Sequence, residues 1–205
     1  MIKTILHLSD THGLHRSLVG LPDADLLVHS GDITMGGSET EAIDFMEWLC
    51  DLPYRHKVFI AGNHDDCLRS AAIDGLPDNC HYLDNSGVTV DGLNIYGVSM
   101  FVTDTMTGKY QRAIQAIPEH TDILITHQPP LGILDFSQGI HYGNMSLCER
   151  VCIISPKLHL FGHIHDAYGK LELNGTVYAN SAVVDENYRI RHPHQLLSIP
   201  PKGLV

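Results

Sequence analysis

The chain has 205 residues, the length of a single domain that can bury a substantial core. Hydrophobic residues make up 43% and charged residues 18%, which excludes a disordered protein. The formal net charge is −11 with histidine neutral, and no lysine and arginine cluster indicates binding to a nucleic-acid duplex. The five cysteines lack CxxC spacing, and no apolar run reaches transmembrane length. We therefore expect one cytoplasmic domain, 1–205, without a membrane partner.

In chain order, five apolar runs rich in β-forming residues predict buried strands, and a polar motif follows each run. The runs cover residues 2–8, 26–30, 57–61, 123–126 and 158–161.

Helices are predicted between several of these strands. The stretch Ser38-Glu39-Thr40-Glu41 is a capping box, and the helix that it begins is expected to end by Leu52-Pro53. Two more helices are predicted over 110–117 and from 144 or 146 to 154. The residues of the first helix that we expect in the core are Ile43, Met46, Trp48 and Leu49.

The remaining segments are predicted hairpins and loops. Asp91-Gly92 and Asn174-Gly175 are turn signals, each between two short strands, and a last strand is expected at 196–198. Residues 99–109 and 131–143 are expected to be irregular, and the second of these loops is a candidate substrate lid. Parallel pairing near the N-terminus and antiparallel hairpins later predict an α/β fold with mixed sheets.

The polar motifs at the strand ends carry metal-ligand side chains: two carboxylates, four imidazoles and one amide oxygen, without a thiolate. Mixed N and O donors suit Mn²⁺, Fe, Zn²⁺ or Ni²⁺ and argue against a structural zinc site. Seven donors exceed what one tetrahedral ion needs and match two ions roughly 3.5–4 Å apart. The donors are Asp10, His12, Asp32, Asn63, His127, His163 and His165.

In this order, the motifs resemble the calcineurin-like metallophosphoesterase superfamily over residues 2–180. More closely, the sequences at 52–54, 60–64, 127–132 and 156–169 resemble small metallophosphoesterase-domain proteins that cleave phosphodiesters. The resemblance implies two mixed β-sheets packed face to face as a sandwich, flanked by helices.

The resemblance also implies a role for each donor, with two divalent ions as cofactors and Mn²⁺ as the expected metal. Asp32 would bridge the two ions. The first ion would be held by Asp10, His12, Asp32 and His165, and the second by Asp32, Asn63, His127 and His163.

His64 follows Asn63 directly, and the resemblance implies that both contact the phosphate and that His64 protonates the leaving oxygen, a role typically worth ~10²–10⁴-fold. Many superfamily members continue the Gly-Asp motif into Asp-Arg-Gly, whose carboxylate orients this histidine. This chain reads Ile33-Thr34-Met35-Gly36-Gly37 after Asp32, which leaves open what orients His64; Asp65 and a backbone carbonyl are candidates.

Other polar residues have a structural as well as a functional interpretation. His7, His29 and His159 lie within predicted strands, where we favour a core role or contact with a metal ligand over metal binding. Asn180, at the end of the last hairpin, is a weak candidate for a base or ribose contact, and His15, in a loop, is expected at the surface.

Together these features predict a dinuclear metal-dependent phosphoesterase that hydrolyses small phosphodiesters, such as a nucleotide or cyclic nucleotide. A hydroxide that bridges the metals would attack phosphorus in line. The alternatives are a weakly active nucleotide-binding regulator on the same fold or a phosphomonoesterase. A nuclease that processes DNA ends is disfavoured by the acidic charge balance. The sequence leaves the oligomeric state open.

Overall fold

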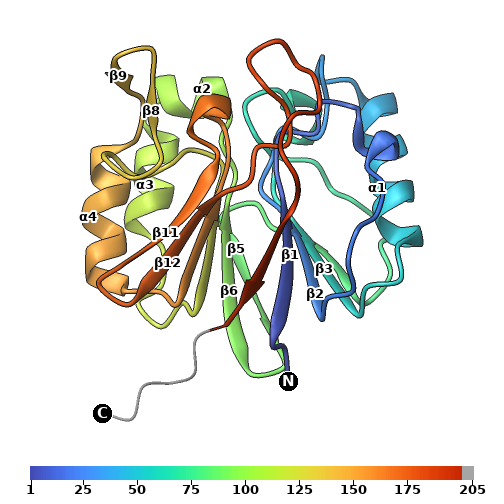
Figure 1. The fold of residues 1–205 in the computed structure, drawn as a ribbon, viewed down its shortest axis with the longest axis horizontal. Coiled ribbons are helices and arrows are strands. Elements are labelled where there is room, and N and C mark those ends of the chain that lie inside the picture. Colours follow the sequence, from blue (N-terminus) through green and yellow to red (C-terminus); the bar gives the residue numbers. More distant parts are fainter. Residues whose placement is uncertain (200–205) are drawn as a thin grey trace.

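The computed structural model describes residues 1–199, so the last six residues of the expected domain, 200–205, lie outside the described residues. Two large mixed sheets pack together between helices, with α1 on one side and α3 and α4 on the other (Figure 1). No helix in residues 1–199 has the length and hydropathy needed to cross a membrane.

The first sheet has five strands in the order β13-β1-β2-β3-β4. Strands β1 to β4 pair in parallel, and β13 joins β1 antiparallel, so the C-terminal part of the chain completes the sheet. The strand bounds are β1 Thr4–Leu8, β2 Leu26–His29, β3 His56–Phe59, β4 Cys80–Tyr82 and β13 Gln195–Ser198.

The second sheet has six strands in the order β11-β12-β10-β7-β6-β5. Its central strands pair in parallel, and the β5–β6 and β11–β12 hairpins add antiparallel edges, as the turn signals predict. The strand bounds are β5 Ser86–Val90, β6 Leu93–Val98, β7 Ile123–Thr126, β10 Leu158–Phe161, β11 Gly169–Leu173 and β12 Thr176–Asn180.

Alternation along the buried strands places one set of side chains between the sheets and the other set under the helices. Ile5 and Val58 of the first sheet share a core with Ile125 and Leu160 of the second. On the outer faces, one core packs beneath α1 and another beneath α3 and α4. The α-helices are α1 Glu39–Asp51, α2 Val102–Met106, α3 Lys109–Gln115 and α4 Met145–Ile154.

The capping box at the start of α1 is confirmed, because Ser38 Oγ accepts the Glu41 N–H and the Glu41 carboxylate accepts the Ser38 N–H. The expected core face is partly wrong. Ile43 is 51% exposed, whereas Phe45 is fully buried. His15 is also buried, against the expectation, and contacts the rings of Phe45 and Trp48.

Both segments predicted to be irregular contain regular structure. Residues 99–109 include α2, whose buried Asp104 forms ion pairs with Arg69 and Lys109. Residues 131–143 include a small hairpin formed by β8 (Phe136–Ser137) and β9 (Ile140–His141). Both turn residues of this hairpin, Gln138 and Gly139, have positive φ, which favours a tight two-residue turn.

Candidate metal centre

Asp10 and Asp32 are the two carboxylates around which the centre is built. Each lies just beyond a parallel strand, β1 and β2 respectively, and the two residues are 0% and 2% exposed. Both have left-handed backbone conformations, with φ of 55° and 56°, which are uncommon for non-glycine residues. Strain of this kind at two adjacent strand ends is typical of a functional site.

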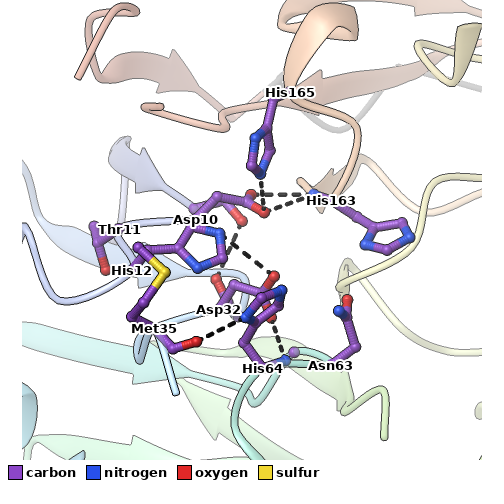
Figure 2. A network of polar contacts seen from close by, with 12 residues as sticks. Asp10, Thr11, His12, Asp32, Met35, Asn63, His64, His163 and His165 are labelled. Carbon is purple, nitrogen blue, oxygen red and sulfur yellow. Dashed lines mark hydrogen bonds and ion pairs between the residues drawn. The ribbon is translucent and has the colours of Figure 1, made fainter. Parts of the chain in front are cut away.

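Imidazole rings from both sheets converge on these carboxylates (Figure 2). His12 Nε2 is 3.6 Å from Asp32 Oδ2, and His127 Nε2 is 3.3 Å from the same oxygen. His165 Nε2 is 3.3 Å from Asp10 Oδ1.

Backbone carbonyls fix which ring nitrogen faces the carboxylates. The Nδ1 atoms of His12, His127 and His165 lie 3.2, 2.9 and 3.0 Å from the carbonyl oxygens of Thr34, Ser30 and Asp185, respectively. A carbonyl only accepts hydrogen bonds, so each Nδ1 carries a proton, and each ring in its neutral form would direct an Nε2 lone pair into the centre.

His163 and Asn63 complete the predicted donor set. The His163 N–H donates to both Asp10 oxygens at 3.1 Å, and its ring lies 4.9 Å from that of His127. Asn63 Oδ1 is 3.1 Å from His127 Nε2. All seven predicted donors therefore lie in one cluster. Asp10, His12 and His165 form one candidate cation site and Asp32, His127 and His163 another, and a third group of close ligand atoms joins His64 to His12 and Asp32.

These residues fit divalent cations. His12 Nε2 is buried without a hydrogen-bond partner. Burial opposes protonation of His127, but the charge of Asp32 and its hydrogen bond outweigh it and raise the pKa of His127 to about 9. Burial likewise opposes ionisation of Asp10, yet its pKa is lowered, chiefly by the hydrogen bond from His165. The cluster thus attracts positive charge, which protons supply when no metal ion is bound.

Two glycines let the strand-end loops approach this closely. A Cβ at Gly62 would overlap Asp32 Oδ1, and a Cβ at Gly162 would overlap Asp10 Oδ2 and Ser9 Oγ. Any side chain there would displace a carboxylate, so the glycine that precedes each of these motifs is a steric requirement.

His64 lies beside the carboxylates and remains half-buried. Its backbone N–H donates to Asp32 Oδ1 at 2.9 Å, and its Nδ1 is 2.9 Å from the Met35 carbonyl oxygen. The group that orients His64 is therefore a backbone carbonyl, one of the two candidates from the sequence.

Asp65, the other candidate, instead joins two of the strand-end loops. Its carboxylate accepts the N–H groups of Ile33, Thr34 and Gly62 at 2.8–3.1 Å. Burial and the nearby Asp32 carboxylate raise its pKa to about 6 against these hydrogen bonds.

The strand histidines His29 and His159 make similar hydrogen bonds in the two sheets. His29 Nε2 bonds Thr11 Oγ1 at 3.0 Å, and His159 Nε2 bonds Thr126 Oγ1 at 2.9 Å. Both are fully buried, and burial lowers the pKa of each to about 3, so they remain neutral. Both rings bond a threonine that is next to a donor in the chain, so they have the structural role that the sequence favours over metal binding.

The interpretation of Asn180 as a substrate contact is wrong. This side chain is fully buried and donates to the carbonyls of Ile164 and Leu134, at 2.9 and 3.3 Å, while accepting the Ala182 N–H. It positions the loops around the centre and has no exposed surface for a ligand.

Sequence reasoning missed the turn that contains Asp185 and Tyr188. The Asp185 carbonyl fixes His165, and the Tyr188 ring lies 4.8 Å from that of His12 and 5.7 Å from that of His165. No ligand-type motif marks this turn, and only the fold brings it to the centre.

Comparisons with known proteins agree with this arrangement. The calcineurin-like phosphoesterase family matches residues 3–167. Metallophosphoesterase domain-containing protein 1 of Homo sapiens is 34% identical over 227 residues, covering 94% of this chain and 69% of that protein. The UPF0046 protein K07C11.7 of Caenorhabditis elegans is also 34% identical, covering 98% of this chain and 76% of that one. The chain belongs to the calcineurin-like phosphoesterase family.

Solved structures show the same fold at low sequence identity. The protein TT1561 of Thermus thermophilus superposes with a TM-score of 0.62 at 13% identity, covering 98% of this chain and 100% of that chain. The phosphopantetheinyl hydrolase PptH of Mycobacterium tuberculosis superposes with a TM-score of 0.60, also at 13% identity. The match covers 100% of this chain and 98% of that chain. The predicted sandwich of mixed sheets is therefore confirmed. This phosphoesterase is a phosphoric ester hydrolase of a family that generally uses two divalent metals.

Proposed function

We propose that this phosphoesterase hydrolyses small phosphodiesters with the help of two divalent cations, Mn²⁺ being the expected metal. Asp10, His12, Asp32 and His165 would hold the first cation. Asp32, Asn63, His127 and His163 would hold the second, with Asp32 shared. The observation that carries this proposal is the convergence of carbonyl-fixed imidazole Nε2 atoms from both sheets on two buried carboxylates.

Charge balance favours a diester over a monoester. Two divalent cations and the carboxylates of Asp10 and Asp32 leave two positive charges. A hydroxide nucleophile and a singly charged diester balance them. A monoester dianion would add a further negative charge and leave the centre with an unbalanced anion.

When bound, the two cations supply a water with a lowered pKa as nucleophile and neutralise charge that develops on the phosphate. Side chains of the protein would orient the phosphate and transfer the proton. The Asn63 amide would orient the phosphate, and His64 would protonate the leaving oxygen. Because the His64 Nδ1–H is engaged by the Met35 carbonyl, the transferable proton is the one on Nε2.

Nucleotides and cyclic nucleotides are candidate substrates, because a cyclic nucleotide is itself a small diester and a nucleotide becomes one when a second alcohol esterifies its phosphate. A weakly active nucleotide-binding regulator is disfavoured, since a regulator that had lost turnover would tolerate the loss of a donor, and all seven donors are present here.

The test is hydrolysis of bis-p-nitrophenyl phosphate by chelator-stripped protein supplied with Mn²⁺, beside p-nitrophenyl phosphate. We expect turnover that depends on metal and is faster on the diester. Asp32→Asn, which keeps an oxygen for the His64 N–H but removes the bridging charge, should abolish it. Absence of turnover with Mn²⁺, Fe²⁺, Zn²⁺ or Ni²⁺, despite metal bound near two ions per chain, would contradict the proposal.

A further inference from the structure

A pocket of about 320 Å³ opens beside His163 and His165, at the edge of the metal centre. This volume is near the lower end of the range for small-molecule sites, enough for one small organic group. Its walls come from three segments, namely the β8–β9 hairpin with the residues just after it, the turn that follows His165, and the turn that follows Asp185.

Tyr188 forms the wall shared by this pocket and the metal centre. Its ring centroid lies 4.8 Å from that of His12 and 6.1 Å from that of His64. The residue has φ of 56°, which is a strained conformation for a bulky side chain. The turn maintains it, because the Tyr188 N–H donates to the Asp185 carbonyl at 2.9 Å and Asp185 Oδ1 accepts the Arg189 N–H at 3.1 Å.

The donors His163 and His165 line the pocket on the side of the metal centre, and the rest of its lining is largely aromatic and acidic. Tyr142 and Tyr188 supply aromatic surface, and Asp166 and Glu186 supply two carboxylates. The Ser137 hydroxyl donates to Asp166 and so links the hairpin to the opposite wall. Among the described residues that line the pocket, none is lysine or arginine. Aromatic faces and carboxylates attract cations and repel anions.

His64, which we assign to the leaving oxygen, does not line this pocket. The pocket is therefore available to the other ester group of the diester, the one that remains bonded to phosphorus after hydrolysis. We infer that the pocket receives this retained organic group and selects a neutral or cationic group over one that carries a second phosphate. Tyr188 is the specificity-determining residue, and Glu186 and Asp166 set the charge preference. This inference rests on the proposed function.

The matched substrates are the p-nitrophenyl ester of thymidine 5′-monophosphate and the same ester with an additional 3′-phosphate. They share a leaving group, and the retained group of the second carries an additional phosphate. The Mn²⁺-loaded protein is expected to favour the first by roughly tenfold in kcat/KM, because the additional phosphate carries a charge of about −1.5 to −2 and is repelled across several ångströms at a partly exposed site. p-Nitrophenyl phosphorylcholine, whose retained group is cationic, is expected to react at least as well as the thymidine ester.

The double variant Glu186→Gln with Asp166→Asn should narrow the preference between the two thymidine esters, whereas Glu172→Gln, an exposed carboxylate on β11 outside the pocket, should leave it unchanged. Tyr188→Asn removes the ring while keeping a residue that tolerates positive φ, and should raise KM for both esters. Tyr188→Phe should behave like the native protein, because the ring forms the wall. An equal rate on both esters, or a preference that survives the double variant, would overturn the inference.

Binding of the two thymidine esters, measured by titration calorimetry on Mn²⁺-loaded native protein and the double variant, separates this inference from the proposed function. If no bis-p-nitrophenyl phosphate is turned over but binding keeps the charge preference and the double variant loses it, the proposed function fails and the pocket assignment stands. If turnover is normal and binding shows no preference, the pocket assignment fails alone.

Discussion

The metal centre and the pocket beside it differ in how the fold holds their side chains. Donors of the centre lie at the ends of buried strands, and backbone carbonyls or loop N–H groups fix them, as for His127 and Asp10. Pocket residues lie on a two-strand hairpin and a tight turn, and Tyr142 and Tyr188 are 44% and 39% exposed. The two regions meet at His163 and His165, but the proposed choice of substrate depends on exposed residues of the hairpin and the turn, whereas the reaction depends on the buried donors. Substitutions in the centre should therefore stop turnover, and substitutions at the pocket should change only what is turned over.

Among substitutions that leave all seven donors in place, the largest effect is expected for His64→Gln with a poor leaving group. If His64 protonates the leaving oxygen, the variant should lose ~10²–10⁴-fold in kcat on a diester with an alkyl leaving group and far less on a p-nitrophenyl diester, whose phenolate leaves without a proton. Parallel kcat measurements on the two substrates check this. An equal loss on both would show that His64 only binds phosphate.

Gly162→Ala should be next, because the new Cβ would overlap Asp10 Oδ2. Displacing a carboxylate by about an ångström is expected to lower kcat by ~10²-fold and to weaken metal binding. Gly169→Ala is the matched control, since its Cβ would make an ordinary contact of 3.4 Å with Leu134. Metal content and kcat of both variants test the prediction, and native values for Gly162→Ala would refute the steric argument.

A smaller effect is expected from pH. In the metal-free protein the pKa of His127 is raised to about 9 by Asp32 despite burial, so the ring is protonated at neutral pH. A metal ion must displace that proton, so affinity should rise about tenfold per pH unit between about pH 6.5 and 9 and then level off. The same raised pKa stabilises the metal-free fold fully below about pH 6.5, and this contribution is lost as pH rises through about 9.

Titration calorimetry at pH 7 in two buffers of different ionisation enthalpy measures the protons released as Mn²⁺ binds. We expect the release of at least about one proton per chain. A heat that does not depend on the buffer would mean that His127 is already neutral.

The smallest effect is expected for Ile140→Ser. Ile140 is 55% exposed on β9 and does not line the pocket. Both kcat and KM should stay within about twofold of native values, as for surface substitutions away from special features. A selective change in KM would extend the substrate-binding surface along the hairpin beyond Tyr142.

The sequence could predict the strand-end donors because each donor is local to an apolar run, and parallel strands bring their carboxyl ends together. The same reasoning could not predict α2, because threonine-rich Val102–Met106 has a weak helix propensity and Asp104 is held by Arg69 and Lys109 from outside the helix. The role of Asn180 escapes prediction for a similar reason. Its burial and its contact with Leu134 arise from packing between segments far apart in the chain.

The role of Tyr188 could not be predicted from the sequence. A lone tyrosine in a polar turn has no motif, and its importance comes from the Asp185 carbonyl, which bonds both its backbone N–H and His165. Positions of this kind can be found only once the fold places the turn against His12.

The bond between Asp185 and His165 also bears on how the protein is made. All seven donors precede Asp185 in the chain, and β13 joins the sheet beside β1 later still. A nascent chain thus contains every carboxylate and imidazole donor before the carbonyl that holds His165 is synthesised. Hydrolytic competence should therefore be acquired only after the turn at Asp185 has been made.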